Sequence, residues 1–504
     1  MKNETRRRLC FWAILLLGIA VRLWRFGGVP EGINQDEAFA GYEAFCLLRD
    51  GMDTAGCRFP VYLTAWGSGM NALETYLMLP FVALFGLKTW VIRLPQLITG
   101  VLSLPALYGV IRRVRDENQA LVTMLLLAIC PWHVLLSRWG LESNLAPGFL
   151  LFGLYFFLRG LENSRFYPLA GLFYGLSLYA YATLWPFVPL LLGLSLVYAA
   201  IHGKLRFDRH LLCGGLTLAL LASPLLLFLA VNFGWIGEIR TAFFSVPRLL
   251  YMRSGELSFS YIPENLKNLF TILWTQADGL PWNTAGVYGL LYPLSAPFAL
   301  LGLLSLLERG ICRKGFDSAA FLGFQLLAGL LLGALVSVNV NRVNLIFPPL
   351  LFLAGEGVCW FCARFRLRLL PLVLAAYLVC FGFFTHFYFT EYRQSLRSSF
   401  AWGLEEALDA VGDKGTVYLS GDVYYPDVLF YAETVPSLFR ESVRYYNYPA
   451  AFLRAESFGR FRFGWESEIE EDAVYILSPW TDGSAFTEAG FSAERYGFYT
   501  LYRK

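Results

Sequence analysis

The sequence predicts an α-helical polytopic membrane protein with a C-terminal α/β domain outside the lipid bilayer. Of its 504 residues, 57% are hydrophobic and 16% are charged, whereas a soluble globular chain has roughly 45–50% apolar and about 25% charged residues. Apolar runs recur over residues 1–390, and many approach the roughly 20 residues that a membrane-spanning helix needs. Residues 391–504 are more polar and carry 18 acidic and 11 basic side chains, a net charge of −7.

The first predicted span follows a basic N-terminus. Lys2, Arg6, Arg7 and Arg8 precede an apolar run that reaches about Phe26. No small-residue cleavage site follows this run, so we predict a retained helix rather than a signal peptide. The positive-inside rule then puts the N-terminus in the cytoplasm.

The next apolar run, Leu73–Leu87, is short for a span and contains Glu74 and Pro80. We predict a re-entrant or interfacial helix here, because a span needs about 20 residues. The following span, at 90–111, then ends at three arginines within 112–115, and the positive-inside rule assigns them to the cytoplasm.

Nine further apolar runs continue the alternation, with basic residues in the loops that we assign to the cytoplasm. They lie near residues 119–137, 145–160, 166–182, 185–202, 211–231, 286–306, 319–338, 343–362 and 369–389. About 11 spans result, and this odd number places the C-terminus outside the cytoplasm. The prediction is a transmembrane domain over 1–390, with outer loops at 28–89 and 232–285, and an extracytoplasmic domain over 391–504.

The tail has the pattern of a small α/β domain. Val417–Ser420 and Ala473–Leu477 are apolar runs typical of buried strands, and Tyr496–Tyr502 alternates like an edge strand. Phe400–Val411 has the periodicity of an amphipathic helix.

Two adjacent carboxylates, Asp36 and Glu37, stand shortly after the first span within Gly32–Ala38. A helix N-terminus is one explanation, because acidic side chains there offset the helix dipole. The alternative is a general base. A sugar hydroxyl has a very high pKa, so an attacking acceptor needs a carboxylate to take its proton, and partial desolvation raises a carboxylate's pKa toward the working range.

Three arginines near the outer ends of spans are candidates for phosphate binding, namely Arg93, Arg138 and Arg342. A guanidinium binds phosphate bidentately. Each arginine could instead anchor its helix at the interface, and anchoring is the favoured interpretation for Arg93. Glu142, close after Arg138, either caps the next helix or supplies a second acid to a cavity.

Aromatic residues make up 17% of the chain, many of them near span ends. Interfacial belts explain most of them, but Tyr181 and Trp185 could also stack on a sugar.

The cysteines give no strong motif. Cys46 and Cys57 share an outer loop, where a disulfide is one alternative to two free thiols. Cys359 and Cys362 have CxxC spacing but no second ligand pair. We find no Walker A loop, no GxGxxG in a Rossmann context and no HExxH, so nothing indicates a nucleotide-driven or zincin-type activity.

Several motifs together resemble bacterial family 39 glycosyltransferases over roughly residues 10–390. They are the Asp36-Glu37 pair, AWGSGMNALETYLMLPFVALFGL, VIRLPQLITG, CPWHVLLSRWGLESNLAP and NRVNLIFPPL. The resemblance implies the GT-C fold, shared with protein O-mannosyltransferases and lipid A aminoarabinose transferases. It implies inverting transfer of a sugar, a hexose or pentose, from a polyprenyl-phosphate carrier.

The same resemblance assigns roles to acidic residues. It makes Asp36 the catalytic acid/base residue, with Glu37 beside it, and puts Glu142 at the second-loop acidic position. A Glu in place of Asp there leaves the role of Glu142 open. Some relatives bind a divalent metal and others need none, and no His/Asp cluster decides between them here.

The predicted partners are a polyprenyl-phosphate sugar donor, the lipid bilayer and a protein or glycolipid acceptor, with no nucleic acid. One rival is a transporter or flippase for lipid-linked saccharides, which predicts repeated halves and intramembrane charges. The sequence has no such repeat, and its notable charges lie at the outer surface. A second rival is a ligase of longer lipid-linked glycans, although the position of Asp36 and Glu37 favours a single-sugar transferase. A non-catalytic receptor would leave Asp36 dispensable.

Overall fold

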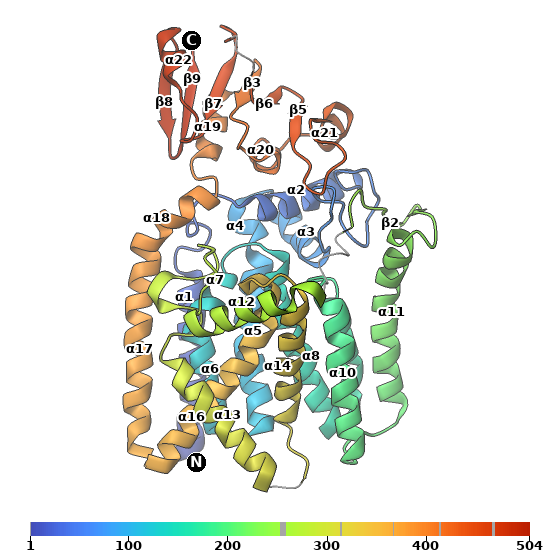
Figure 1. Cartoon of the computed structure of the whole chain (residues 1–504), viewed down its shortest axis with the longest axis vertical. Coiled ribbons are helices and arrows are strands. Elements are labelled where there is room, and N and C mark those ends of the chain that lie inside the picture. The colour runs from blue at the N-terminus through green and yellow to red at the C-terminus, as the bar shows by residue number, and fades with distance from the viewer. Residues whose placement is uncertain (1, 253–258, 313–314, 366, 413–414, 466–468) are drawn as a thin grey trace.

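A computed structural model of the chain describes all residues except 1, 253–258, 313–314, 366, 413–414 and 466–468. Long helices stand side by side in a bundle, and a sheet domain lies beyond one end of it (Figure 1). The N-terminus is at the opposite end of the bundle from this domain, which holds the C-terminus. We refer to the end that carries the sheet domain as the outer end.

Six helical segments among the described residues are long and apolar enough to cross a membrane. They are Thr89–Val114, Glu142–Glu162, Leu184–Ile201, Arg209–Asn232, Val340–Phe365 and Leu370–Ser399. These segments contain α4 (Thr89–Ile92), α5 (Leu94–Val114), α8 (Glu142–Glu162), α10 (Leu184–Ile201), α11 (Arg209–Asn232), α15 (Val340–Val343), α16 (Phe347–Phe365), α17 (Leu370–Phe387) and α18 (Arg393–Leu396). The prediction of a helical multi-span membrane protein is confirmed.

Five other predicted spans coincide with helices outside these six segments. They are α1 (Lys2–Leu23), α6 (Glu117–Ile129), α9 (Tyr167–Ser177), α13 (Ser295–Cys312) and α14 (Ala320–Leu335). The run at 119–137 is divided because Cys130, which precedes Pro131, has extended backbone angles, as proline requires of its neighbour. The short helix α7 (Pro131–Leu136) follows. The total of 11 spans and the orientation of the termini stay predictions.

Glycines allow the closest helix crossings in the bundle. A Cβ added to Gly302 of α13 would meet the backbone of Leu353, and one on Gly357 of α16 would meet the backbone of Phe298. Small residues of this kind let membrane helices approach closely where no hydrophobic effect drives them together. The α13–α16 pair is therefore fixed by shape.

The outer end is built from α2 (Gln35–Asp50), α3 (Leu73–Phe85) and α12 (Ile262–Thr275). Asn34 and Glu37 form a capping box at the start of α2, which satisfies backbone N–H groups that the helix leaves open. The helix α3 has 13 residues, too few to span, in keeping with the predicted interfacial helix. The strands β1 (Ile239–Arg240) and β2 (Ser245–Val246) form a small hairpin after α11.

The tail forms a seven-stranded mixed sheet with the order β4-β5-β6-β3-β7-β9-β8. The strands are β3 (Val417–Leu419), β4 (Arg444–Tyr445), β5 (Ala455–Phe458), β6 (Phe461–Phe463), β7 (Val474–Leu477), β8 (Ser492–Tyr496) and β9 (Tyr499–Arg503). The helices are α19 (Leu404–Val411), α20 (Tyr425–Tyr431), α21 (Pro436–Ser442) and α22 (Ser484–Glu488).

Most of the predicted elements of the tail are confirmed, with one correction. The two buried strands and the helix correspond to β3, β7 and α19. The predicted edge strand Tyr496–Tyr502 is wrong, because it covers a hairpin turn and β9 lies inside the sheet, between β7 and β8. The alternation of β9 reflects its two differently packed faces rather than an edge position.

The sheet domain and the outer end of the bundle share one apolar core. Buried side chains from residues 33–92 pack with buried side chains from residues 401–501 in a single cluster. The hydroxyl of Tyr42 on α2 donates to the carbonyl of Thr434 at 2.7 Å, and Gly41 lies close to the ring of Phe430 on α20. The first outer loop and the tail therefore hold each other in place.

Candidate functional site

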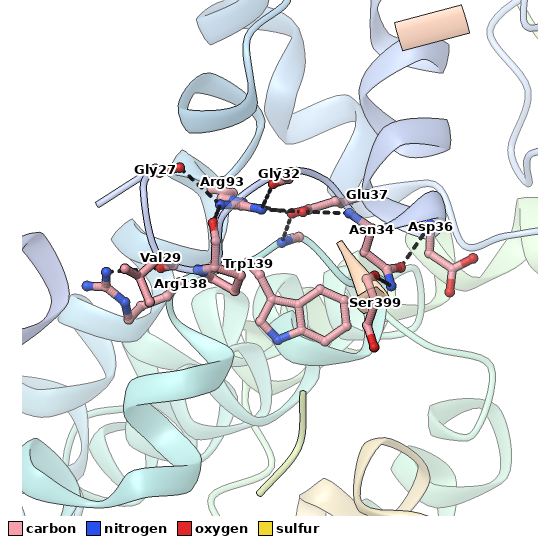
Figure 2. Close-up of polar contacts among 12 residues, drawn as sticks. Gly27, Val29, Gly32, Asn34, Asp36, Glu37, Arg93, Arg138, Trp139 and Ser399 are labelled. Carbon is pink, nitrogen blue, oxygen red and sulfur yellow. Dashed lines mark hydrogen bonds and ion pairs between the residues drawn. The ribbon is translucent and has the colours of Figure 1, made fainter. Parts of the chain in front are cut away.

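A fully buried ion pair fixes the outer end of the bundle. The Nε and Nη2 atoms of Arg93 donate to the two carboxylate oxygens of Glu37 at 3.0 and 2.5 Å, and both side chains are 0% exposed. Arg93 also donates to the carbonyls of Gly27, Pro30 and Gly32 (Figure 2). All five guanidinium N–H groups are thus engaged.

Glu37 links three parts of the chain. Besides Arg93, it accepts from the backbone N–H of Asn34 at 3.1 Å and of Gly140 at 2.7 Å. The start of α2, the start of α5 and the loop before α8 meet at this carboxylate. The sequence predicted Glu37 as a catalytic residue and Arg93 as a phosphate-binding residue. The geometry of the ion pair instead supports a positioning role for both side chains.

Arg138 has a similar anchoring geometry. It is 0% exposed, and its two Nη atoms donate at 2.7–3.2 Å to the carbonyls of Val21, Arg22, Arg25 and Val29. These carbonyls lie at or just beyond the C-terminus of α1, where a helix leaves acceptors open and favours a cation. The geometry favours anchoring over the predicted phosphate binding, because both Nη atoms of the guanidinium already donate to backbone carbonyls of the protein.

Asp36 is placed differently from its neighbour. It lies half-buried in the first turn of α2, and its backbone N–H donates to the Asn34 side chain at 3.1 Å. Figure 2 shows its carboxylate directed away from the Arg93–Glu37 pair. Its negative charge helps to raise the pKa of Glu74 and of Asp427, so it lies within electrostatic reach of both.

Glu74 is an acidic residue of this region that sequence analysis did not include among the site residues. It is buried in the first turn of α3 and accepts from Gln96 at 2.5 Å. Burial, followed by the charge of Glu142, raises its pKa well above the ordinary range. An isolated Glu in an apolar run is itself a signal of a functional site, although the sequence prediction takes Glu74 only as an argument against a membrane span.

A cavity of about 280 Å³ at the outer end is lined by one of these acids, Glu142. It brings together four predicted site residues from three segments: Glu142 at the start of α8, Tyr181 and Trp185 around the start of α10, and Arg342 in α15. The carboxylate of Glu142 accepts from the backbone N–H of Asn71, another lining residue. The cavity therefore combines a cation, an acid and aromatic surfaces.

The aromatic wall of this cavity is well fixed. The indole N–H of Trp185 donates to the carbonyl of Leu178 at 2.9 Å, and its ring packs edge-on against Tyr62 and Phe228. A rigid, partly apolar wall of this kind suits stacking on the C–H face of a sugar ring.

The thiols and metal-binding groups add no further site. Cys46 and Cys57 are both buried and free, so the disulfide alternative is wrong. Among the described residues, no three His, Cys, Asp or Glu side chains are grouped to hold a metal ion. We therefore assign no metal ligand.

A known family model matches part of the sequence, and known structures share the fold of the chain. Residues 73–228 match the family model of dolichyl-phosphate-mannose-protein mannosyltransferases. The structure resembles ArnT from Cupriavidus metallidurans, apo and bound to undecaprenyl phosphate, with TM-scores of 0.59 and 0.60 and 14% identity. These alignments cover 99% and 98% of this chain and 98% and 97% of ArnT.

A more distant likeness is to the oligosaccharyltransferase of Archaeoglobus fulgidus tethered with an acceptor peptide. The TM-score is 0.52 at 14% identity, over 84% of this chain and 62% of that chain. None of the curated protein sequences matches the chain. The family resemblance predicted from the sequence is confirmed over residues 73–228, and the chain as a whole has the fold of ArnT.

Proposed function

We propose that this protein transfers a sugar from a polyprenyl-phosphate carrier to an acceptor at the outer face of the membrane, with inversion at the anomeric carbon. One observation carries the proposal: the 280 Å³ cavity gathers Glu142, Tyr181, Trp185 and Arg342. The charges of Glu142 and of Asp36 both raise the pKa of Glu74, so both carboxylates lie within electrostatic reach of it. The ArnT structure with bound undecaprenyl phosphate supports a lipid-linked donor for this fold. In the proposed topology the N-terminus is cytoplasmic and the C-terminal domain is extracytoplasmic.

Arg342 is the residue proposed to hold the donor phosphate. Of the three predicted arginines, it alone lines the cavity, whereas Arg93 and Arg138 are buried against carbonyls and Glu37. A guanidinium neutralises the charge that develops on the phosphate as the bond to the sugar breaks. Tyr181 and Trp185 hold the sugar by stacking.

Asp36 is proposed as the general base. The acceptor hydroxyl oxygen attacks the anomeric carbon, its proton passes to the Asp36 carboxylate, and the bond from that carbon to the phosphate oxygen breaks. The electron pair leaves with the polyprenyl phosphate, so a single displacement inverts the anomeric centre. Glu37 and Arg93 position Asp36 by fixing the first turn of α2, and Glu142 is the second acid of the donor cavity.

The decisive experiment compares sugar transfer by the wild type and Asp36→Asn from a panel of radiolabelled polyprenyl-phosphate sugars in purified protein. Loss of the base should lower turnover about 10²- to 10⁴-fold, while Asp409→Asn, on an exposed face of α19, keeps wild-type activity. Equal activity of Asp36→Asn and wild type would remove Asp36 from the mechanism. Binding of a lipid-linked saccharide without turnover would instead support a transporter or ligase.

A further inference from the structure

A second cavity, of about 550 Å³, lies between the sheet domain and the start of α2. From the sheet domain it is lined by residues that follow two strands: Asp422, Val423 and Tyr424 after β3, and Ser478, Pro479 and Trp480 after β7. From the bundle side it is lined by Asn34 and Gln35, which directly precede Asp36. We call this cavity the tail cleft.

The topology of the sheet explains why a cleft forms there. The strands β3 and β7 are parallel neighbours, so their carboxyl ends share one edge. The chain leaving β3 returns to the sheet on the β6 side, while the chain leaving β7 continues toward β8 and β9. In open sheets with parallel strands, such a switch point separates the two loops and forms the usual ligand crevice.

The side chains in the tail cleft point to a ligand rich in hydroxyl groups. Asp427 is 3% exposed, and its Oδ1 atom has no hydrogen-bond partner among the described residues. A buried polar atom of this kind is costly unless something binds it. Burial raises the pKa of Asp427 well above the ordinary range, and a protonated carboxyl both donates to and accepts from a hydroxyl. Trp480 is 80% exposed and offers a flat apolar face.

The charge of the tail cleft argues against a phosphorylated ligand. Of the described residues that line it, none is Arg, Lys or His. A phosphate in the cleft would therefore have no cation to hold it. A bound peptide would be expected to pair with an exposed strand edge, but the cleft lies at strand ends, where side chains rather than unpaired strand backbone face the ligand.

We infer that the tail cleft is the acceptor site and that it binds a neutral, hydroxyl-rich saccharide next to Asp36. This inference rests on the proposed function, because it assigns the acceptor half of the same reaction. A neighbouring cavity of about 340 Å³ shares Asp422, Val423 and Tyr424 and is also lined by Trp66, which gives a longer glycan room to continue.

The test uses an array of neutral oligosaccharides, their phosphorylated counterparts and Ser/Thr peptides, probed with the full-length protein in nanodiscs. The wild type should bind neutral glycans, and Trp480→Ala should weaken this binding about tenfold, as expected for loss of one aromatic stacking contact. Trp235→Ala is the matched control, because Trp235 is 76% exposed and lies outside the cleft. Asp427→Leu should also abolish binding while thermal unfolding reports that the protein is folded.

A separate measurement keeps the two proposals apart. Binding of a polyprenyl-phosphate sugar should be the same in Trp480→Ala as in the wild type, because Trp480 does not line the donor cavity. Binding only to phosphorylated glycans or peptides, binding to no neutral glycan, or neutral-glycan binding unchanged in Trp480→Ala and Asp427→Leu would overturn the inference. Absence of donor turnover in a wild type that still binds neutral glycans would instead refute the proposed reaction and leave the cleft assignment standing.

Discussion

Adjacent residues at the start of α2 have opposite environments. Glu37 is 0% exposed and accepts from Arg93, Asn34 and Gly140, whereas Asp36 is half-buried and directed away from that pair. A buried ion pair with every guanidinium donor engaged stabilises one geometry, whereas a half-buried carboxylate is accessible enough to exchange a proton. The sequence predicted both carboxylates as catalytic because adjacency alone cannot show which of two side chains faces inward.

Replacing Arg93 by Met should strongly destabilise the protein. The change leaves Glu37 as a buried charge without its cation, which typically costs about 3–5 kcal/mol. Thermal unfolding in detergent should show a large fall in Tm. Arg25→Met provides the control, since Arg25 is 44% exposed and 4.0 Å from Glu31, and it should shift Tm little. Similar small shifts in both variants would contradict a structural role for the pair.

Replacing Arg342 by Ala should weaken binding of the donor and leave the stability of the fold unchanged. Arg342 lines the 280 Å³ cavity proposed to hold the donor. Its loss should therefore reduce affinity for polyprenyl phosphate about 10- to 100-fold, as for a charge-assisted contact of about 1.5–3 kcal/mol. The measurement is titration of the purified protein with polyprenyl phosphate. Arg240→Ala, an arginine that is 61% exposed in β1, should leave the affinity unchanged, and equal affinities in all three proteins would remove Arg342 from the donor site.

At the scale of elements, sequence periodicity located helices better than it located their ends. The helix predicted at 73–87, re-entrant or interfacial, is found as the short α3, yet the single run at 119–137 is two helices divided at Pro131. Similarly, β9 alternates like an edge strand but is covered by β8. Periodicity reports which faces are apolar, whereas strand order depends on contacts between distant segments that a single sequence does not display.

Two neighbouring buried acids, Glu43 on α2 and Asp53 in the loop that follows it, should make the stability of the outer end depend on pH. Glu43 and Asp53 are both 0% exposed, and burial raises the pKa of Asp53 to about 6 and that of Glu43 well above its usual range. The folded state retains protons that the unfolded chain releases near pH 4. Their stabilising contribution is therefore complete below about pH 4 and is lost as the pH rises through about 6.

Asp53→Asn should remove part of the loss of stability that the wild type shows as the pH rises. The amide keeps an oxygen for the N–H groups of Ala55 and Cys57, which donate to Asp53 at 3.0 and 2.7 Å, but it cannot ionise. Thermal unfolding between pH 4 and 7 should show that the free energy of unfolding of the variant, relative to the wild type, increases by about 2 kcal/mol as the pH rises. Asp409→Asn controls for a simple change of charge. A difference that shrinks toward pH 7 would have the wrong sign.

At the scale of the whole molecule, the predicted division at residue 390 does not separate two independent apolar cores. Buried side chains from α2, α3 and their loop pack with those of α20, β3 and β9 in one apolar cluster. Asn34, which caps the helix that carries Asp36, donates from its side chain to the carbonyl of Ser399 at 3.0 Å. The start of α2 is thereby fixed to the segment that leads into the sheet domain.

Removing residues 395–504 should unfold the outer end instead of only changing acceptor choice. The deletion exposes large apolar side chains such as Phe39 and Tyr42, each of which is at most 1% exposed in the full chain. Burial of one such side chain stabilises the fold by about 1.5–3 kcal/mol. Size-exclusion chromatography and thermal unfolding should show an aggregation-prone protein with a lower Tm and weak donor binding. Adding the tail as a separate chain should restore part of both properties.

A truncated protein with wild-type Tm and donor affinity would show that the shared core contributes little, and the tail would then be a replaceable acceptor module. The structure argues for the opposite arrangement, because the residues on either side of Asp36 are held from two directions. Arg93 and Glu37 fix it from the bundle, and Asn34 and Ser399 fix it from the tail. A base whose position depends on both parts can act only when the tail is docked, so this fold couples acceptor recognition to the placement of its proposed catalytic group.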